Sequence, residues 1–65
     1  MQNNRGKTIK DRLNEDIEYA ENLKSAESKE ILALKALGAA DMAVEFGLIT
    51  YNEWETYIDR LFKIM

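Results

Sequence analysis

A chain of 65 residues forms one small domain, and a domain of this size buries only about 60% of the surface that its unfolded form exposes. It contains no cysteine and no histidine, which excludes disulfides and the usual ligands of zinc and haem, so we expect no metal, cofactor or small-molecule substrate. The formal net charge of −3 opposes non-specific binding to nucleic acid or anionic membranes. Because so small a core has neither a disulfide nor a metal to support it, we expect stabilisation by self-association, most simply as a homodimer.

The N-terminal residues 1–7 show no hydrophobic period and predict a flexible basic arm ahead of a single helical domain at 8–65. Positive charge gathers at this end of the chain, on Arg5, Lys7, Lys10 and Arg12. The N-terminus lacks the apolar core of a signal peptide, and no apolar run is long enough to span a membrane. These features predict a cytoplasmic protein.

A first helix is expected at 8–24. Thr8 is a suitable N-cap, and Asp11 falls at the third helical position, where a carboxylate interacts favourably with the helix dipole. Apolar residues recur at helical spacing behind this cap, at Ile9, Leu13, Ile17, Ala20 and Leu23. Asp16 interrupts the apolar stripe, so we interpret it as a candidate polar contact with a lysine or arginine at the rim of the core.

The polar interval at 24–30 separates the first helix from the second. Ser25 or Ser28 is a suitable N-cap for a new helix. The interval contains neither glycine nor proline, so a single helix over 8–46, about 58 Å long, is the alternative, and it would require a dimer.

The second helix, expected at 28–46, is apolar around most of its circumference, which is typical of a central helix with two neighbours. Four alanines share one face at helical spacing: Ala33, Ala36, Ala40 and Ala43. Gly38 lies outside that face and costs about 1 kcal/mol relative to alanine. We expect another backbone or a bulky ring to approach it closely.

A tight corner is predicted between the second helix and the third. Gly47 suits the left-handed residue that ends a helix in a Schellman motif. Thr50 and Glu53 have the spacing of a capping box, and Ile49 and Trp54 have that of a hydrophobic staple.

The last helix, expected at 51–64, is the most clearly amphipathic part of the chain, with an apolar arc of about 160°. Aromatic residues are concentrated on it, and tryptophan and tyrosine are enriched at protein interfaces. The candidate interface residues are Tyr51, Trp54, Tyr57, Ile58, Leu61 and Phe62.

Motifs for catalysis and for base recognition are weak. Arg5-Gly6-Lys7-Thr8 is similar to the end of a phosphate-binding loop, but the first glycine of that motif would fall on Met1. With no histidine and with carboxylates mostly on solvent faces, the chain is not expected to be an enzyme. A DNA-reading helix at 51–62 would expose several carboxylates and Arg60 as its single cation, which opposes phosphate contact.

The residues Gly47-Leu48-Ile49-Thr50, Glu53-Trp54-Glu55 and Leu61-Phe62 resemble the SHOCT domain, a short C-terminal domain of bacterial proteins, over residues 31–62. Tyr57-Ile58 stands where that family usually has basic residues. The resemblance implies a non-enzymatic bacterial module for oligomerisation or binding, with no catalytic residue.

Together these patterns predict an all-α domain of three helices, whose last two form an antiparallel hairpin that dimerises into a helical bundle. We expect a non-enzymatic protein–protein interaction module, such as a bacterial or phage-encoded regulator or inhibitor that occupies a surface of its partner. Two alternatives remain open. One is a nucleic-acid-associated protein that uses the basic arm. The other is an acidic inhibitor whose carboxylates imitate phosphates.

Overall fold

Three helices make up the computed structural model, which describes residues 8–65. They are α1 (Ile9–Glu21), α2 (Ala26–Glu45) and α3 (Tyr51–Ile64), and no strand occurs in this range. The prediction of an all-α domain with three helices is confirmed. None of the three is long and apolar enough to cross a membrane. The predicted arm at 1–7 lies outside the described residues.

Helix α1 begins at the predicted cap and ends earlier than predicted. The Thr8 side chain accepts a hydrogen bond from the Asp11 N–H (3.2 Å), and the Asp11 carboxylate accepts one from the Thr8 N–H (3.1 Å). At the other end the Asn22 side chain donates to the Glu18 carbonyl (2.8 Å). Asparagine competes in this way for backbone groups, which favours helix ends. The predicted end at residue 24 was therefore about one turn too late.

The chain leaves the helical conformation after α1, so the alternative of one helix over 8–46 is wrong. Ser25 is the N-cap of α2, with its hydroxyl accepting from the Ser28 N–H (3.3 Å). The second helix therefore begins at Ala26 and not at 28. Because the Asn22 side chain bonds to the backbone at the end of α1 and the Ser25 hydroxyl accepts one of the unpaired N–H groups at the start of α2, the break needs neither glycine nor proline.

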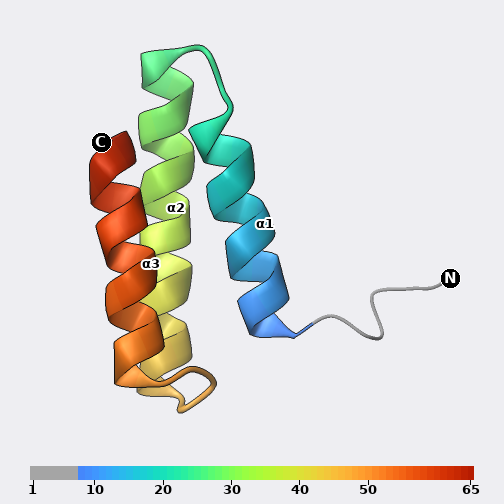
Figure 1. The fold of residues 1–65 in the computed structure, drawn as a ribbon, viewed down its shortest axis with the longest axis vertical. Coiled ribbons are helices and arrows are strands. Elements are labelled where there is room, and N and C mark those ends of the chain that lie inside the picture. The colour runs from blue at the N-terminus through green and yellow to red at the C-terminus, as the bar shows by residue number, and fades with distance from the viewer. Residues whose placement is uncertain (1–7) are drawn as a thin grey trace, which may run out of the picture.

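Helix α2 lies beside both α1 and α3, and its alanine face forms the centre of the core (Figure 1). All four alanines of that face are buried. Small side chains let helices approach closely, so long residues from the neighbouring elements fill the core. Those residues are Leu13 and Ile17 of α1, Ile49 of the corner, and Tyr57, Ile58 and Leu61 of α3.

The corner before α3 has the predicted geometry. Gly47 has a φ of 75°, and its N–H donates to the Val44 carbonyl (3.1 Å), while the Leu48 N–H donates to the Ala43 carbonyl (2.8 Å). These are the two hydrogen bonds of a Schellman motif. Thr50 and Glu53 exchange hydrogen bonds of 3.1 and 2.7 Å in a capping box. Helix α3 then returns alongside α2 in the opposite direction (Figure 1).

The expected close approach at Gly38 is wrong. Gly38 is exposed, and a Cβ atom added to it would meet nothing within 4 Å. It lies on the solvent side of α2, where the backbone is helical and no packing requires glycine. The residue therefore weakens α2 without a compensating contact.

Candidate interaction surface

The structure divides five of the six candidate interface residues into two groups and leaves Trp54 between them. Tyr57, Ile58 and Leu61 are buried in the core of the single chain, with exposed fractions of 6%, 8% and 0%. Phe62 and Tyr51 are 60% and 63% exposed. A partner can reach the first group only if the helices separate, so the accessible part of the predicted interface is the margin of the apolar arc.

Trp54 lies at that margin and links α3 to α2. Its indole Nε1 donates a hydrogen bond to a carboxylate oxygen of Asp41 (2.8 Å), and its half-buried ring packs against the core. The Tyr51 ring lies 5.2 Å from the Trp54 ring, centroid to centroid, with the planes tilted by 31°. Since the indole N–H is already bonded, Trp54 offers a partner its ring and not its donor.

Leu34 of α2 lies beside the exposed part of α3. Asp41 and Trp54 are level with one another because they are hydrogen-bonded. The two helices run in opposite directions with equal rise, so Leu34, seven residues before Asp41, lies level with position 61 of α3 and, two helical turns from Asp41, on the same side of α2. Leu34 is 54% exposed. We call Leu34, Tyr51, Trp54, Phe62 and Met65 the α2–α3 strip.

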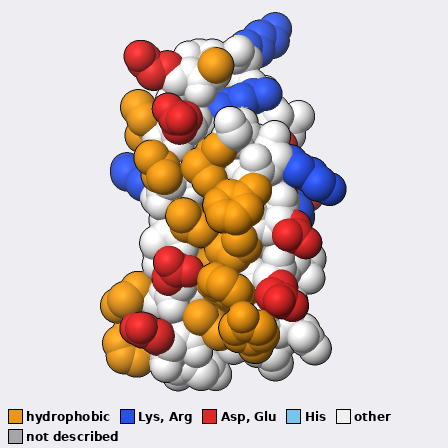
Figure 2. All heavy atoms as spheres, turned by 90° about the vertical axis from the view of Figure 1, so that its left-hand side faces the viewer, with side chains coloured by type: hydrophobic (Ala, Val, Ile, Leu, Met, Phe, Trp, Pro, Cys, Tyr) orange, Lys and Arg blue, Asp and Glu red, His pale blue; other side chains and the backbone are white. Residues whose placement is uncertain are grey.

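Leu34 is not among the interface residues predicted from the sequence. It falls on the polar side of its helix, between Glu30 and Asp41 at spacings of four and seven residues. A large apolar residue inside an otherwise acidic row was the signal that it has a surface role. Figure 2, which views the molecule from the side where α3 lies, shows hydrophobic side chains along the long axis with acidic groups on both sides.

The α3 border of the strip carries two exposed carboxylates. Glu55 lies four residues after Tyr51, and Asp59 lies three residues before Phe62, so both are surface neighbours of strip residues. Lys63, four residues after Asp59, is the cation on this border.

The α2 border is acidic as well. Its exposed carboxylates lie at helical spacing from Leu34: Glu30, Asp41 and Glu45. Asp41 accepts the Trp54 indole bond, which uses one of its oxygens. An apolar surface between two acidic borders is thus the main chemical feature of this face.

Ion pairs join α1 to the other flank of α3. Arg60 donates to both carboxylate oxygens of Glu21 (3.1 and 3.3 Å) and to the Asn14 side chain (3.0 Å). The Lys10 ammonium lies 2.7 Å from the Glu53 carboxylate. Hydrogen bonding with Glu53 raises the pKa of Lys10 above its usual 10.5, and hydrogen bonding with Lys10 lowers the pKa of Glu53 below its usual 4.5. Glu53 therefore caps α3 and also attaches α1 to it.

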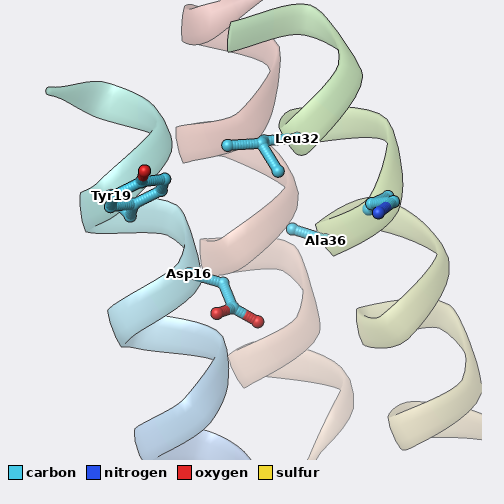
Figure 3. A pocket seen from close by; sticks show the side chains of 5 residues that line it. Asp16, Tyr19, Leu32 and Ala36 are labelled. Carbon is cyan, nitrogen blue, oxygen red and sulfur yellow. The ribbon is translucent and has the colours of Figure 1, made fainter. Parts of the chain in front are cut away.

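Asp16 lies at a shallow hollow between α1 and α2 (Figure 3). The hollow has a volume of about 220 Å³ and is lined by Asp16, Tyr19, Leu32, Lys35 and Ala36. Asp16 is exposed, and among residues 8–65 no lysine or arginine forms an ion pair with it. The predicted contact of Asp16 with a cation is therefore not found among residues 8–65.

Within the described part of the chain, no cluster of three or more acidic residues has the geometry to hold a metal ion. Two of the cations considered for nucleic-acid contact, Lys10 and Arg60, are engaged by Glu53 and Glu21. A phosphate would have to compete with those carboxylates.

Comparison of the chain with protein-family models, with curated proteins and with solved structures finds no match. The resemblance of residues 31–62 to the SHOCT domain therefore stays a prediction from the residues quoted above.

Proposed function

We propose that this protein is a non-enzymatic interaction module that binds another protein through the α2–α3 strip. The observation that carries the proposal is the alignment of exposed apolar side chains on one face. Leu34, Tyr51 and Phe62 are each more than half exposed. Scattered apolar residues are normal on a surface, but contiguous ones bordered by charges are typical of interaction sites. Tyrosine, tryptophan and phenylalanine are also the residue types enriched in such sites.

The proposal includes the biological setting inferred from sequence. A short chain without disulfides is compatible with a cytoplasmic bacterial or phage-encoded regulator or inhibitor that occupies a surface of its partner. The SHOCT-like residues support a module for binding or oligomerisation, since three of them, Gly47, Thr50 and Glu53, build the corner that positions α3.

Self-association is the second candidate function. The side-chain core of the single chain is small, because α2 contributes alanines to it. A second copy that covered the hairpin of α2 and α3 would form a helical bundle and add buried apolar surface. In that case the apparent stability would rise with protein concentration.

Site-specific photocrosslinking in the native cells tests the proposal. A photoreactive phenylalanine analogue such as p-benzoylphenylalanine replaces Phe62 in one variant and Phe46 in the other. Phe46 is the matched control, because it is 69% exposed and, at the C-cap of α2, lies about 120° around that helix from Leu34. We expect a discrete protein adduct from position 62 and none of that mass from position 46. Equal adducts at both positions, or none at position 62, would remove the basis of the proposal.

The mass of the adduct also separates the two candidate functions. An adduct between two copies of this chain supports self-association, whereas an adduct with a different protein supports the regulator or inhibitor. Mass spectrometry of the excised adduct identifies which of the two is present.

A further inference from the structure

We propose that the occupant of the α2–α3 strip is a basic amphipathic helix of another protein. The inference rests on the proposed function, because it names the partner class for the same surface. It is carried by two independent features, the shape of the free seam between α2 and α3 and the charge along its two borders.

The strip lies on the side of the α2–α3 pair that α1 does not cover. Glu53 and Arg60 bond to residues of α1 and so mark the flank of α3 that faces it. Tyr51 and Phe62 are each two residues away from one of that pair, a rotation of about 200° around the helix. The strip therefore lies on the side of α3 turned away from α1, next to α2 through the Trp54–Asp41 bond.

A helix is the element that fits this seam. In Figure 2 apolar side chains form a column along the long axis of the molecule, with further apolar side chains along the left edge of the view. The column follows the axes of the two antiparallel helices. A helix laid in such a seam buries residues at positions i, i+3 or i+4, and i+7 against both of its neighbours. The Leu34–Phe62 end and the Tyr51–Trp54 end of the strip would each contact one part of that apolar stripe.

The charges on the two borders of the strip favour a partner of positive charge. Five exposed carboxylates lie at helical spacing from strip residues, Glu55 and Asp59 on α3 and Glu30, Asp41 and Glu45 on α2. Lys63 lies on the α3 border, and further lysine or arginine side chains lie at the upper end and edges of this face (Figure 2). A docked helix would bring the residues beside its own apolar stripe close to these carboxylates. Lysines and arginines there would be attracted along both edges, and acidic residues would be repelled.

The same pattern opposes a second copy on this surface. In a two-fold symmetric pair the same strip faces itself, so each acidic border would meet an acidic border. Like charges brought together in an interface lower affinity and exclude partners. We therefore assign the strip to a basic helix from a different protein.

Fluorescence anisotropy with a synthetic probe tests this inference. The probe is a labelled 18-residue helix of leucine and lysine, with leucine on one face, and its partner probe has glutamate in place of lysine. We expect the full-length protein to bind the leucine–lysine helix and to leave the leucine–glutamate helix unbound at the same concentration. Added salt should weaken the binding without abolishing it, because the apolar contact is not screened.

Matched variants separate the border charges from net charge. Glu55→Lys reverses a border carboxylate and should weaken binding by about tenfold. Glu18→Lys changes net charge equally on an exposed position of α1 and should leave the affinity within about twofold. Phe62→Ala should weaken binding by at least about tenfold, and Phe46→Ala should not. Circular dichroism verifies that each variant keeps its helices.

Three outcomes would overturn the inference: no binding of the basic helix, equal binding of the acidic helix, or equal loss from Glu55→Lys and Glu18→Lys. Each leaves the photocrosslinking result at position 62 unaffected. A discrete adduct at position 62 together with a failed peptide titration would keep the interaction surface and reject its basic partner. Absence of the adduct would reject both.

Discussion

Leu61 and Phe62 are adjacent large apolar residues of α3 for which we predict opposite effects on truncation. Leu61 is fully buried and Phe62 is 60% exposed. Leu61→Ala removes three buried carbon atoms and leaves a cavity between the helices, which costs about 2–5 kcal/mol of unfolding free energy. A single core in a domain of this size supplies only about 3–5 kcal/mol. Because the parent domain is itself only marginally stable, we expect Leu61→Ala to be largely unfolded at 25 °C.

Phe62→Ala should instead change the unfolding free energy by less than about 0.5 kcal/mol, because the ring remains mostly in water in the folded chain. Urea titrations followed by far-ultraviolet circular dichroism and by Trp54 fluorescence measure both variants against the parent chain. They are run at several protein concentrations, since a stabilising second copy would make the midpoint concentration-dependent.

The reasoning is refuted if the two variants lose similar stability. A large loss in Phe62→Ala would mean that the side chain is buried in solution, either by rearrangement of α3 or by a second copy. Concentration dependence of the midpoint distinguishes these two causes. A small loss in Leu61→Ala would mean that the three helices do not share the core described above.

Four further substitutions have defined outcomes. Gly38→Ala should stabilise the protein by about 0.5–1 kcal/mol, because the added methyl meets open space in a helix. Gly47→Ala should destabilise it by about 1 kcal/mol because of the positive φ. Urea titration should therefore show changes in unfolding free energy of opposite sign for the two variants. Ser25→Ala should cost about 1 kcal/mol through loss of the α2 cap, and an unchanged midpoint would contradict this. The lowered pKa of Glu53 means that its contribution to stability is present above about pH 4.5 and is lost as pH falls through its folded-state pKa. Lys10→Met should flatten that acid dependence of the unfolding free energy, and an unchanged slope would show that the pair does not stabilise the fold.

The raised pKa of Lys10 acts at the other end of the pH range. Its contribution is complete below the unfolded value near 10.5 and is lost as pH rises through the folded-state pKa. The ion pair is therefore intact across the neutral range. Because both groups are solvent-exposed, salt should reduce the contribution of the pair at every pH.

Local chemistry explains which parts of the fold were predictable. The caps at Thr8 and Thr50 and the left-handed Gly47 depend on residues within four positions of one another, so their patterns are visible in sequence. The end of α1 also depends on local residues, but there two local signals disagree and the prediction followed the wrong one. Leu23 continues the apolar period and favoured a longer helix, but the side chain of Asn22 binds the Glu18 carbonyl and ends it.

Features that depend on distant residues were not predictable. The pairing of Arg60 with Glu21 joins positions 39 residues apart, and no periodicity within one helix indicates it. The same limitation applies to the apolar arc of α3. Its period predicted which residues are apolar together, but only the placement of α1 and α2 separates buried Ile58 from exposed Phe62. The open space at Gly38 is also a consequence of tertiary packing.

The alanine face of α2 links the core to the proposed surface. Methyl side chains at Ala40 and Ala43 let α3 lie close to α2, and close helices leave little room between them for large residues. The apolar arc of α3 is wider than this contact, so its margin, at Tyr51 and Phe62, extends past the seam into solvent. Larger side chains on this face of α2 would separate the two helices and let the residues at the margin of the α3 arc pack between them. The exposed strip therefore includes the part of the α3 apolar arc that the contact with α2 does not cover, and under our proposal its acidic borders select a basic partner helix.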